Sequence, residues 1–316
     1  MITIGLDLGG TNVTAIAHDG AKVLASTKHR TPTTGGRSDV LDLLARAVDE
    51  TMDAAGLKRK HVAAVGVGSP GIVTDGTVGN ASNVPGFQSR FALDEEVAAR
   101  TGLPVRVAND VTAAAVGEHR LGSGRGEDDL LAVFVGTGVG GGLILGGRPF
   151  EGGTGGAGEF GHLVVRQGGA VCPCGRRGCV EAYAGRRAMV LAAERAVAGG
   201  RASILFEVMR EKGKPRPTSG VFRDTLQRGD ALLTELLEDA VATLAAGIAT
   251  AVNLLDLGRV VVGGGLADKL GAPFVARIEA AAQRSLFLQP PRARIVPAAL
   301  GDHGGAIGAA LVARDD

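Results

Sequence analysis

The chain has 316 residues, enough for two domains, and its content of 45% hydrophobic and 21% charged residues is that of a globular protein. A net charge of +1, with nine Phe, one Tyr and no Trp, argues against a nucleic-acid-binding surface. No run of 18 apolar residues predicts a membrane span, and the first residues lack the features of a signal peptide. We therefore expect a cytoplasmic protein with reduced thiols.

The first third of the chain gives strand and helix signals in the order βββαβαβ. Apolar or alternating runs predict strands at residues 2–7, 13–18, 22–27, 61–68 and 103–108. Helices are predicted at 38–55, where Ser38 can cap the start and Gly56 can end it, and at 93–100.

The same order restarts at Asp129. Strands are predicted at 130–136, 141–147, 162–166, 259–265 and 293–298, with helices at about 271–285 and 303–313. A mainly helical region of roughly 75 residues, including the apolar stripe 231–255, is inserted between the third and fourth of these strands. The repetition predicts a duplicated α/β architecture with two domains on either side of a cleft. We expect a small N-terminal domain at 1–112, with the C-terminal helix of about 302–316 packed back on it. A larger domain is expected at 113–301.

Three strands end in glycine turns, DLGGTN at 7–12, GTGVGGG at 136–142 and GGG at 263–265. Exposed backbone N–H groups in such turns can bind phosphate oxygens, although each turn alone could simply be a tight hairpin. Gly136, Gly138 and Gly141 fit G-x-G-x-x-G, but a strand follows where a dinucleotide site needs a helix. Two glycine hairpins, one in each half, instead predict a pair of loops that hold the phosphates of a nucleotide.

Further motifs accompany these turns: GSPGIV, ASNVPGF, VANDVTAAAVGE, GEFGH, the cysteine cluster within residues 172–179, and VVVGGGLAD. Together with the turns, they resemble the motifs of the ROK family of sugar kinases and repressors. Their order and spacing are most similar to those of its bacterial zinc-containing glucokinases, nearly from end to end. The resemblance implies an actin/hexokinase-like, ribonuclease H-like ATPase fold. It also implies ATP-dependent phosphorylation of glucose to glucose 6-phosphate, a hexokinase-type reaction of glycolysis and carbohydrate metabolism.

The resemblance also assigns residues. It implies that Asp110 is the general base that takes the proton of the sugar hydroxyl, whereas the sequence alone allows a helix N-cap at this position. The residues that it places around the sugar are Asn83, Asn109, Asp110, Glu159, His162 and Glu181. Those that it places at ATP and Mg²⁺ are Asp7, Gly9, Gly10, Thr11, Asn12, Thr137, Gly138, Gly264 and Gly265.

All three cysteines, Cys172, Cys174 and Cys179, lie within eight positions. A disulfide would leave one thiol over, an iron–sulfur cluster normally needs four cysteines, and a redox dithiol usually has the spacing C-x-x-C. Zinc takes four N or S ligands, and His162 is the nearest histidine. We predict a structural Cys3His zinc site, with redox-active or inert thiols as the alternatives.

The same motifs are compatible with functions other than glucose phosphorylation. The same contacts suit N-acetylmannosamine, N-acetylglucosamine, fructose or mannose, and a non-catalytic sugar-responsive regulator is a further alternative. Family repressors carry an additional N-terminal helix-turn-helix segment, whereas this sequence starts at the first predicted strand. We expect no nucleic-acid or membrane partner. By analogy with the family we expect a homodimer, with a tetramer as the alternative.

Overall fold

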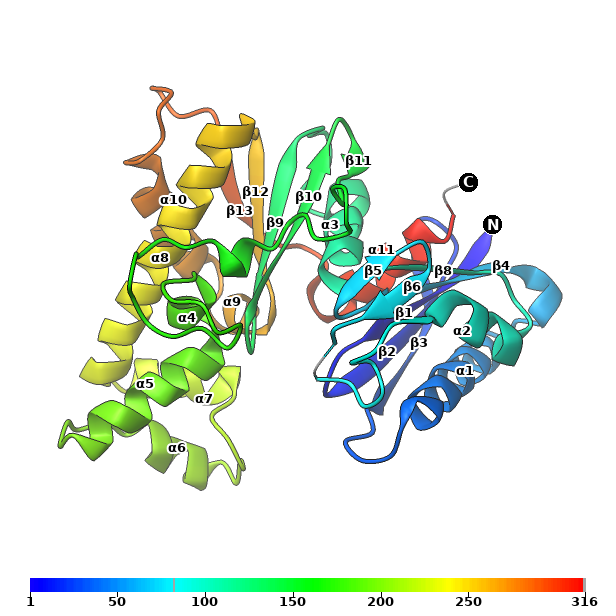
Figure 1. Ribbon diagram of the computed structural model, residues 1–316, viewed down its shortest axis with the longest axis horizontal. Helices are drawn as coiled ribbons and strands as arrows, with labels where there is room; N and C mark the ends of the chain where they lie inside the picture. Colours follow the sequence, from blue (N-terminus) through cyan, green and yellow to red (C-terminus); the bar gives the residue numbers. More distant parts are fainter. Residues whose placement is uncertain (82, 315–316) are drawn as a thin grey trace. The chain divides into compact units, whose positions relative to one another are not determined.

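The computed structural model describes residues 1–81 and 83–314, which form two compact units. The first unit comprises Met1–Asp128, Gly142–Gly158 and Asp302–Asp316, and the second comprises Asp129–Gly141 and Glu159–Gly301. Figure 1 shows the elements of both units along the chain. Among the described residues, every helix is too short or too polar to cross a lipid bilayer.

The first unit is built on a five-stranded sheet in the order β3-β2-β1-β4-β8. Its strands are β1 (Ile2–Leu8), β2 (Asn12–His18), β3 (Val23–Arg30), β4 (Val62–Ser69) and β8 (Val105–Asn109). The pairs β1–β2 and β2–β3 are antiparallel, and β1, β4 and β8 run parallel. A small second sheet contains β5 (Ile72–Thr74), β6 (Thr77–Gly79) and β7 (Phe91–Ala92).

Helices cover both faces of this five-stranded sheet, which explains why β1, β2 and β4 are almost continuously apolar. Helices α1 (Arg37–Ala54) and α2 (Leu93–Thr101) pack on one face, and α11 (Gly304–Val312) packs on the other (Figure 1). Ile4, Leu6 and Leu8 point into the core shared with α1. On the opposite face the Thr3 hydroxyl donates to the carbonyl of Ala310 in α11. The edge strand β3 alternates between partly buried and exposed residues.

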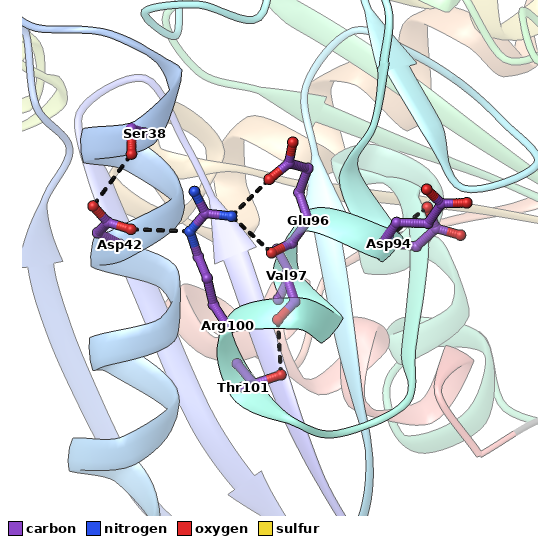
Figure 2. A network of polar contacts seen from close by, with 8 residues as sticks. Ser38, Asp42, Asp94, Glu96, Val97, Arg100 and Thr101 are labelled. Atoms are coloured by element: carbon purple, nitrogen blue, oxygen red, sulfur yellow. Dashed lines mark hydrogen bonds and ion pairs between the residues drawn. The ribbon is translucent and has the colours of Figure 1, made fainter.

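An ion-pair network joins the two helices on the first face. Figure 2 shows Arg100 of α2 donating to Asp42 of α1 at 2.9 Å and to Glu96, one turn earlier in α2, at 2.7 Å. Because the acidic partners are exposed, we expect each pair to stabilise the fold by about 1 kcal/mol or less.

The first unit extends past the boundary expected at residue 112 because α3 (Asp110–Leu121) packs closely on α11. A Cβ added at Gly308 would lie 1.6 Å from the carbonyl oxygen of Ala113, so only glycine permits this approach. The α3 helix therefore belongs with the N-terminal strands and with the C-terminal helix.

A second close approach gives a test of this packing. A Cβ at Gly66 in β4 would lie 1.8 Å from the carbonyl oxygen of Ala309 in α11. We expect Gly66→Ala to lower the free energy of unfolding by about 1–3 kcal/mol, because α11 would have to move away from the sheet. Gly153→Ala, at an exposed glycine with nothing near the added Cβ, is the matched control and should change it by less than about 0.5 kcal/mol. Equal midpoints in urea unfolding for the two variants would contradict this account.

The second sheet repeats the topology of the first, in the order β11-β10-β9-β12-β13. Its strands are β9 (Leu130–Val135), β10 (Val139–Leu145), β11 (Arg148–Pro149), β12 (Arg259–Gly263) and β13 (Arg294–Pro297). The strands β9, β12 and β13 are parallel, like β1, β4 and β8. The duplicated α/β pattern predicted from the sequence is therefore present.

The third strand of the repeat is β11, and the strand predicted at 162–166 is wrong. The chain there forms the 3-10 turn η2 (Phe160–His162), followed by a single bridge between Val164 and Cys179. The Val164 side chain is 49% exposed, so the apolar letters of this segment do not line a sheet core. The segment instead enters the cysteine loop.

The second unit carries seven of the described helices. Outside these helices, the described chain also contains two further 3-10 turns. Its helices are α4 (Glu181–Ala184), α5 (Arg186–Ala198), α6 (Leu205–Glu211), α7 (Ser219–Gln227), α8 (Ala231–Leu255), α9 (Gly265–Leu270) and α10 (Ala272–Gln283). The two turns are η1 (Arg59–His61) and η3 (Gly301–His303). The long helix α8 begins where the side chain of Asp230 accepts a hydrogen bond from the backbone N–H of Leu233.

Candidate active site

Polar residues of the first unit collect where its parallel strands end. Asp7, near the end of β1, pairs with Gly68 of β4, and Ser69 of β4 pairs with Asn109 at the end of β8. The carboxyl ends of parallel strands are where α/β proteins bind their ligands. Asp7, Asn109 and Asp110 therefore lie at one edge of the sheet, as the sequence predicts for members of one site.

The structure separates the roles of Asn109 and Asp110. The side-chain oxygen of Asn109 accepts from the backbone N–H groups of Val111 at 2.9 Å and Thr112 at 3.2 Å, so Asn109 is the N-cap of α3. Its amide nitrogen donates to the carbonyl of Gly71. Asp110 is the first residue of α3, and its carboxylate accepts from the N–H of Val111. The capping alternative considered for Asp110 thus applies to its neighbour.

The carboxyl group of Asp7 is in an unusual environment. Burial, and after it the nearby charge of Asp110, raise its pKa to about 7, and the charge of Lys28 partly opposes this shift. Gly305, in the first turn of α11, lies directly against this carboxyl group, since a Cβ there would be 2.8 Å from Cγ of Asp7. Asp7 and Asp110 therefore influence each other electrostatically, as expected of acidic groups in one site.

The β1–β2 hairpin holds Gly9, Gly10, Thr11 and Asn12. The N–H of Gly9 donates to the carbonyl of Asn12 across the turn, and Thr31 fastens the turn by donating its hydroxyl to the carbonyl of Gly9 at 2.6 Å. Asn83 lies beside the turn, because a Cβ at Gly10 would be 2.9 Å from its side-chain nitrogen. The structure thus brings Asn83 to the glycine hairpin.

In the second unit, Glu181 lies against the second glycine hairpin. Its carboxylate accepts from the backbone N–H of Val139 at 2.8 Å and lies so close to Gly138 that a Cβ there would clash with it. Thr137, at the tip, contributes its carbonyl to the N–H of Arg187 and its hydroxyl to the guanidinium of Arg186. The start of α5 is therefore tied to the hairpin.

Gly264 and Gly265 lie between β12 and α9. Gly264 has φ of +89°, and a Cβ there would lie 2.7 Å from the backbone nitrogen of Val135, so glycine is required at this position. Gly265 begins α9, and a Cβ there would be 3.8 Å from the hydroxyl of Ser219.

The predicted zinc ligands come together within the second unit. One donor atom from each of His162, Cys172, Cys174 and Cys179 lies within 4.8 Å of the others. The Sγ atom of Cys172 is 3.6 Å from Nδ1 of His162, and the Sγ atoms of Cys174 and Cys179 are 3.8 Å apart. Bonds of about 2.3 Å to sulfur and about 2.0–2.1 Å to nitrogen give tetrahedral edges of about 3.6 Å for N–S and about 3.8 Å for S–S. The four side chains therefore fit a tetrahedral zinc ion.

The other ring nitrogen of His162 points to a carboxylate. Nε2 lies 3.8 Å from Oε2 of Glu159, three residues earlier in the chain. This distance is too long for a hydrogen bond, but a carboxylate on this side could orient the ring if the other nitrogen bound a metal. The six predicted sugar residues fall into two sets, with Asn83, Asn109 and Asp110 in the first unit and Glu159, His162 and Glu181 in the second.

Sequence reasoning missed a group of arginines. Arg186, Arg187 and Arg216 line one pocket of the second unit together with Thr137. The sequence feature that could have indicated this group is the pair Arg186-Arg187, which begins five residues after Glu181. Arg216 belongs to the segment 210–220, which reads from the sequence as a surface loop and lies mostly between α6 and α7.

The chain matches the ROK family over residues 3–316. It is 36% identical to the glucokinase of Streptomyces coelicolor, over 99% of this chain and 98% of that one. It is 33% identical to the N-acetylmannosamine kinase of Pasteurella multocida, over 85% of this chain and 83% of that one.

A solved structure has the same fold. The ROK family glucokinase of Streptomyces griseus, determined in complex with glucose and AMPPNP, superimposes with a TM-score of 0.84 at 33% identity, over 99% of each chain. The predicted hexokinase-like, two-domain ATPase fold is thereby confirmed. The repeated strand order, the glycine hairpins and these full-length matches lead to one conclusion: the chain belongs to the ROK family.

Proposed function

We propose that this protein is a glucokinase, a hexokinase-type phosphotransferase that transfers the γ-phosphoryl group of ATP to glucose and releases glucose 6-phosphate and ADP. The observation that carries the proposal is the position of Asp110, a carboxylate at the carboxyl end of β8 in the unit that also holds the first glycine hairpin. The names of the relatives support glucose as the acceptor.

In the proposed reaction, the carboxylate of Asp110 accepts the proton of the glucose 6-hydroxyl. The hydroxyl oxygen forms a bond to the γ-phosphorus while the bond from that phosphorus to the bridging oxygen of ADP breaks. Phosphoryl transfer depends chiefly on positioning and charge stabilisation. A single aligned base is therefore enough to activate the acceptor hydroxyl. Mg²⁺, when bound with ATP, neutralises the phosphate charge.

The remaining residues position the two substrates. Asn83 and Asn109, with Glu159, His162 and Glu181, supply amide, carboxylate and imidazole groups for the hydroxyls of the sugar. The phosphate oxygens would lie against the backbone of the hairpin Gly9, Gly10, Thr11 and Asn12 and of the tip residues Thr137 and Gly138, with Asp7 close to Mg²⁺. The N–H of Gly9 already donates to Asn12, so the other N–H groups of these turns would bind the phosphates. Gly264 and Gly265 would lie under the adenosine.

The zinc ion in this proposal is structural. Held by His162, Cys172, Cys174 and Cys179, it would fix the loop that ends at Glu181, two residues after Cys179, and would fix the ring of His162. Both residues belong to the proposed sugar site, so the metal is expected to support sugar affinity as well as stability. We further propose that the protein acts in the cytoplasm as a homodimer.

A panel of sugars tests the substrate. ADP formation with Mg-ATP is measured for glucose, mannose, fructose, N-acetylglucosamine and N-acetylmannosamine, and we expect kcat/KM to be highest for glucose. A preference for N-acetylmannosamine would leave the mechanism intact but replace the substrate, as the name of the Pasteurella relative suggests. Glucose binding without turnover of any sugar would favour a sugar-responsive regulator.

A further inference from the structure

The second unit contains a cationic pocket of about 200 Å³ beside the second glycine hairpin. Its lining is Thr137, Arg186, Arg187, Val190, Leu191, Arg216 and Pro217. Three arginines thus line one cavity, and among the described residues its lining includes no carboxylate. A concave site with one sign of charge attracts ligands of the opposite sign.

Arg186 is held rigidly in this pocket. Its Nη2 donates to the hydroxyl of Thr137 at 2.9 Å, and its Nη1 donates to the hydroxyl of Ser219 at 2.8 Å. These two bonds use two of the five N–H donors of the guanidinium, so three remain for a ligand. Because the Thr137 oxygen accepts from Arg186, its own proton is available to donate to a ligand oxygen. The arginine and the threonine are therefore pre-organised to bind the same anion.

In the part of the chain that the structure describes, the lining of this pocket offers Arg186 no carboxylate partner. Burial and the nearby guanidinium of Arg216 lower the pKa of Arg186 from its usual value. Two neighbouring guanidiniums repel each other, and an anion bound between them removes the repulsion. Arginine binds phosphate through planar paired hydrogen bonds, which makes phosphate the anion best suited to these groups.

The position of Arg186 indicates which part of the nucleotide it would contact. On one side lies Thr137 at the tip of the second glycine hairpin, and on the other lies Ser219, which adjoins Gly265. The first of these is proposed to bind phosphate oxygens and Gly265 to lie under adenosine. Arg186 therefore bridges the two parts of the nucleotide site within one unit.

We infer that Arg186, assisted by Arg216, binds the phosphoanhydride chain of the phosphoryl donor. This inference rests on the proposed function, since it adds residues to the donor side of that site. The shared chemistry is a chain of linked phosphates, which either a nucleoside triphosphate or inorganic polyphosphate can provide. Arg216 is exposed, on the segment before α7, and supplies the second positive charge.

The test measures binding of AMPPNP, tripolyphosphate and adenosine by titration calorimetry to wild type, Arg186→Met, Arg216→Ala and Arg195→Ala. We expect Arg186→Met to weaken AMPPNP and tripolyphosphate by at least about tenfold, the loss expected for a hydrogen bond to a charged group. Arg216→Ala should weaken both less, and adenosine should bind all four proteins equally. Arg195→Ala, which removes an exposed arginine of the same helix outside this pocket, is the matched control.

The outcomes separate the inference from the proposed function. Unchanged affinity for AMPPNP and tripolyphosphate in Arg186→Met and Arg216→Ala overturns the inference, and so does adenosine binding that falls as far as AMPPNP binding. Wild type that binds tripolyphosphate through Arg186 but not AMPPNP supports the inference and overturns ATP as the donor. Unchanged thermal midpoints and glucose affinity show that the variants are folded, and Arg216→Ala, at an exposed position, carries the test if Arg186→Met is unfolded.

Discussion

Asp110→Asn is expected to lower kcat for glucose phosphorylation by about 10²–10⁴-fold, the usual contribution of a general base. The asparagine amide cannot accept the hydroxyl proton in the transition state, although it has nearly the same size. Stability should change little, because Asn109 and not Asp110 caps α3. Steady-state kinetics and urea unfolding of the same preparation provide the two readouts.

Asn109→Ala is the matched variant for this prediction. It removes the side-chain oxygen that accepts from Val111 and Thr112, and should lower the free energy of unfolding by about 1 kcal/mol. We therefore expect Asp110→Asn to lose kcat with little loss of stability, and Asn109→Ala to lose stability. An Asp110→Asn enzyme with near-normal kcat would contradict the assignment of Asp110 as the base, and one that is unfolded under assay conditions would contradict the assignment of the cap to Asn109.

Cys179→Ser is expected to lower both thermal stability and glucose affinity. Cys179 is fully buried and is one of the four proposed zinc ligands, so the variant would lose one ligand of the proposed site. Loss of a structural metal removes its binding free energy from the folded state. Because Glu181 and His162 are held by the same loop, the dissociation constant for glucose should rise together with the loss of zinc.

The measurements for this prediction are zinc content, thermal midpoint and glucose affinity. Wild type should contain one zinc per chain, and chelation should reproduce the effect of Cys179→Ser. Val171→Ser is the control in the same loop, because its side chain is 60% exposed and is not a ligand. Metal-free protein with an unchanged thermal midpoint and unchanged glucose affinity would show that the cysteines have no such role.

The strands of the first unit were predictable because a strand that is buried on both faces consists almost entirely of apolar residues. The runs in β1 and β4 are apolar for this reason, and β3 alternates because it lies at the edge. The strand predicted at 162–166 failed because Leu163 and Val164 are apolar letters on a partly exposed segment leading into the cysteine loop. Local periodicity does not distinguish these two situations.

The predicted site residues differ in how far sequence alone could locate them. The cysteine cluster is recognisable from its spacing, and His162 is the nearest histidine along the chain. The division between Asn109 as cap and Asp110 as the following residue required backbone geometry, since either residue type can cap a helix. Arg186 and Arg216 are 30 positions apart and meet only through the packing of α5 and the segment before α7, which no local pattern records.

The most direct test of the central claim is the initial rate of glucose 6-phosphate formation by the zinc-loaded protein with Mg-ATP and glucose, compared with that of Asp110→Asn. We predict rapid formation, with one ADP released for each glucose 6-phosphate, and a rate for the variant lower by at least about 10²-fold. Wild-type protein that binds glucose but forms no glucose 6-phosphate would contradict the proposed glucokinase activity.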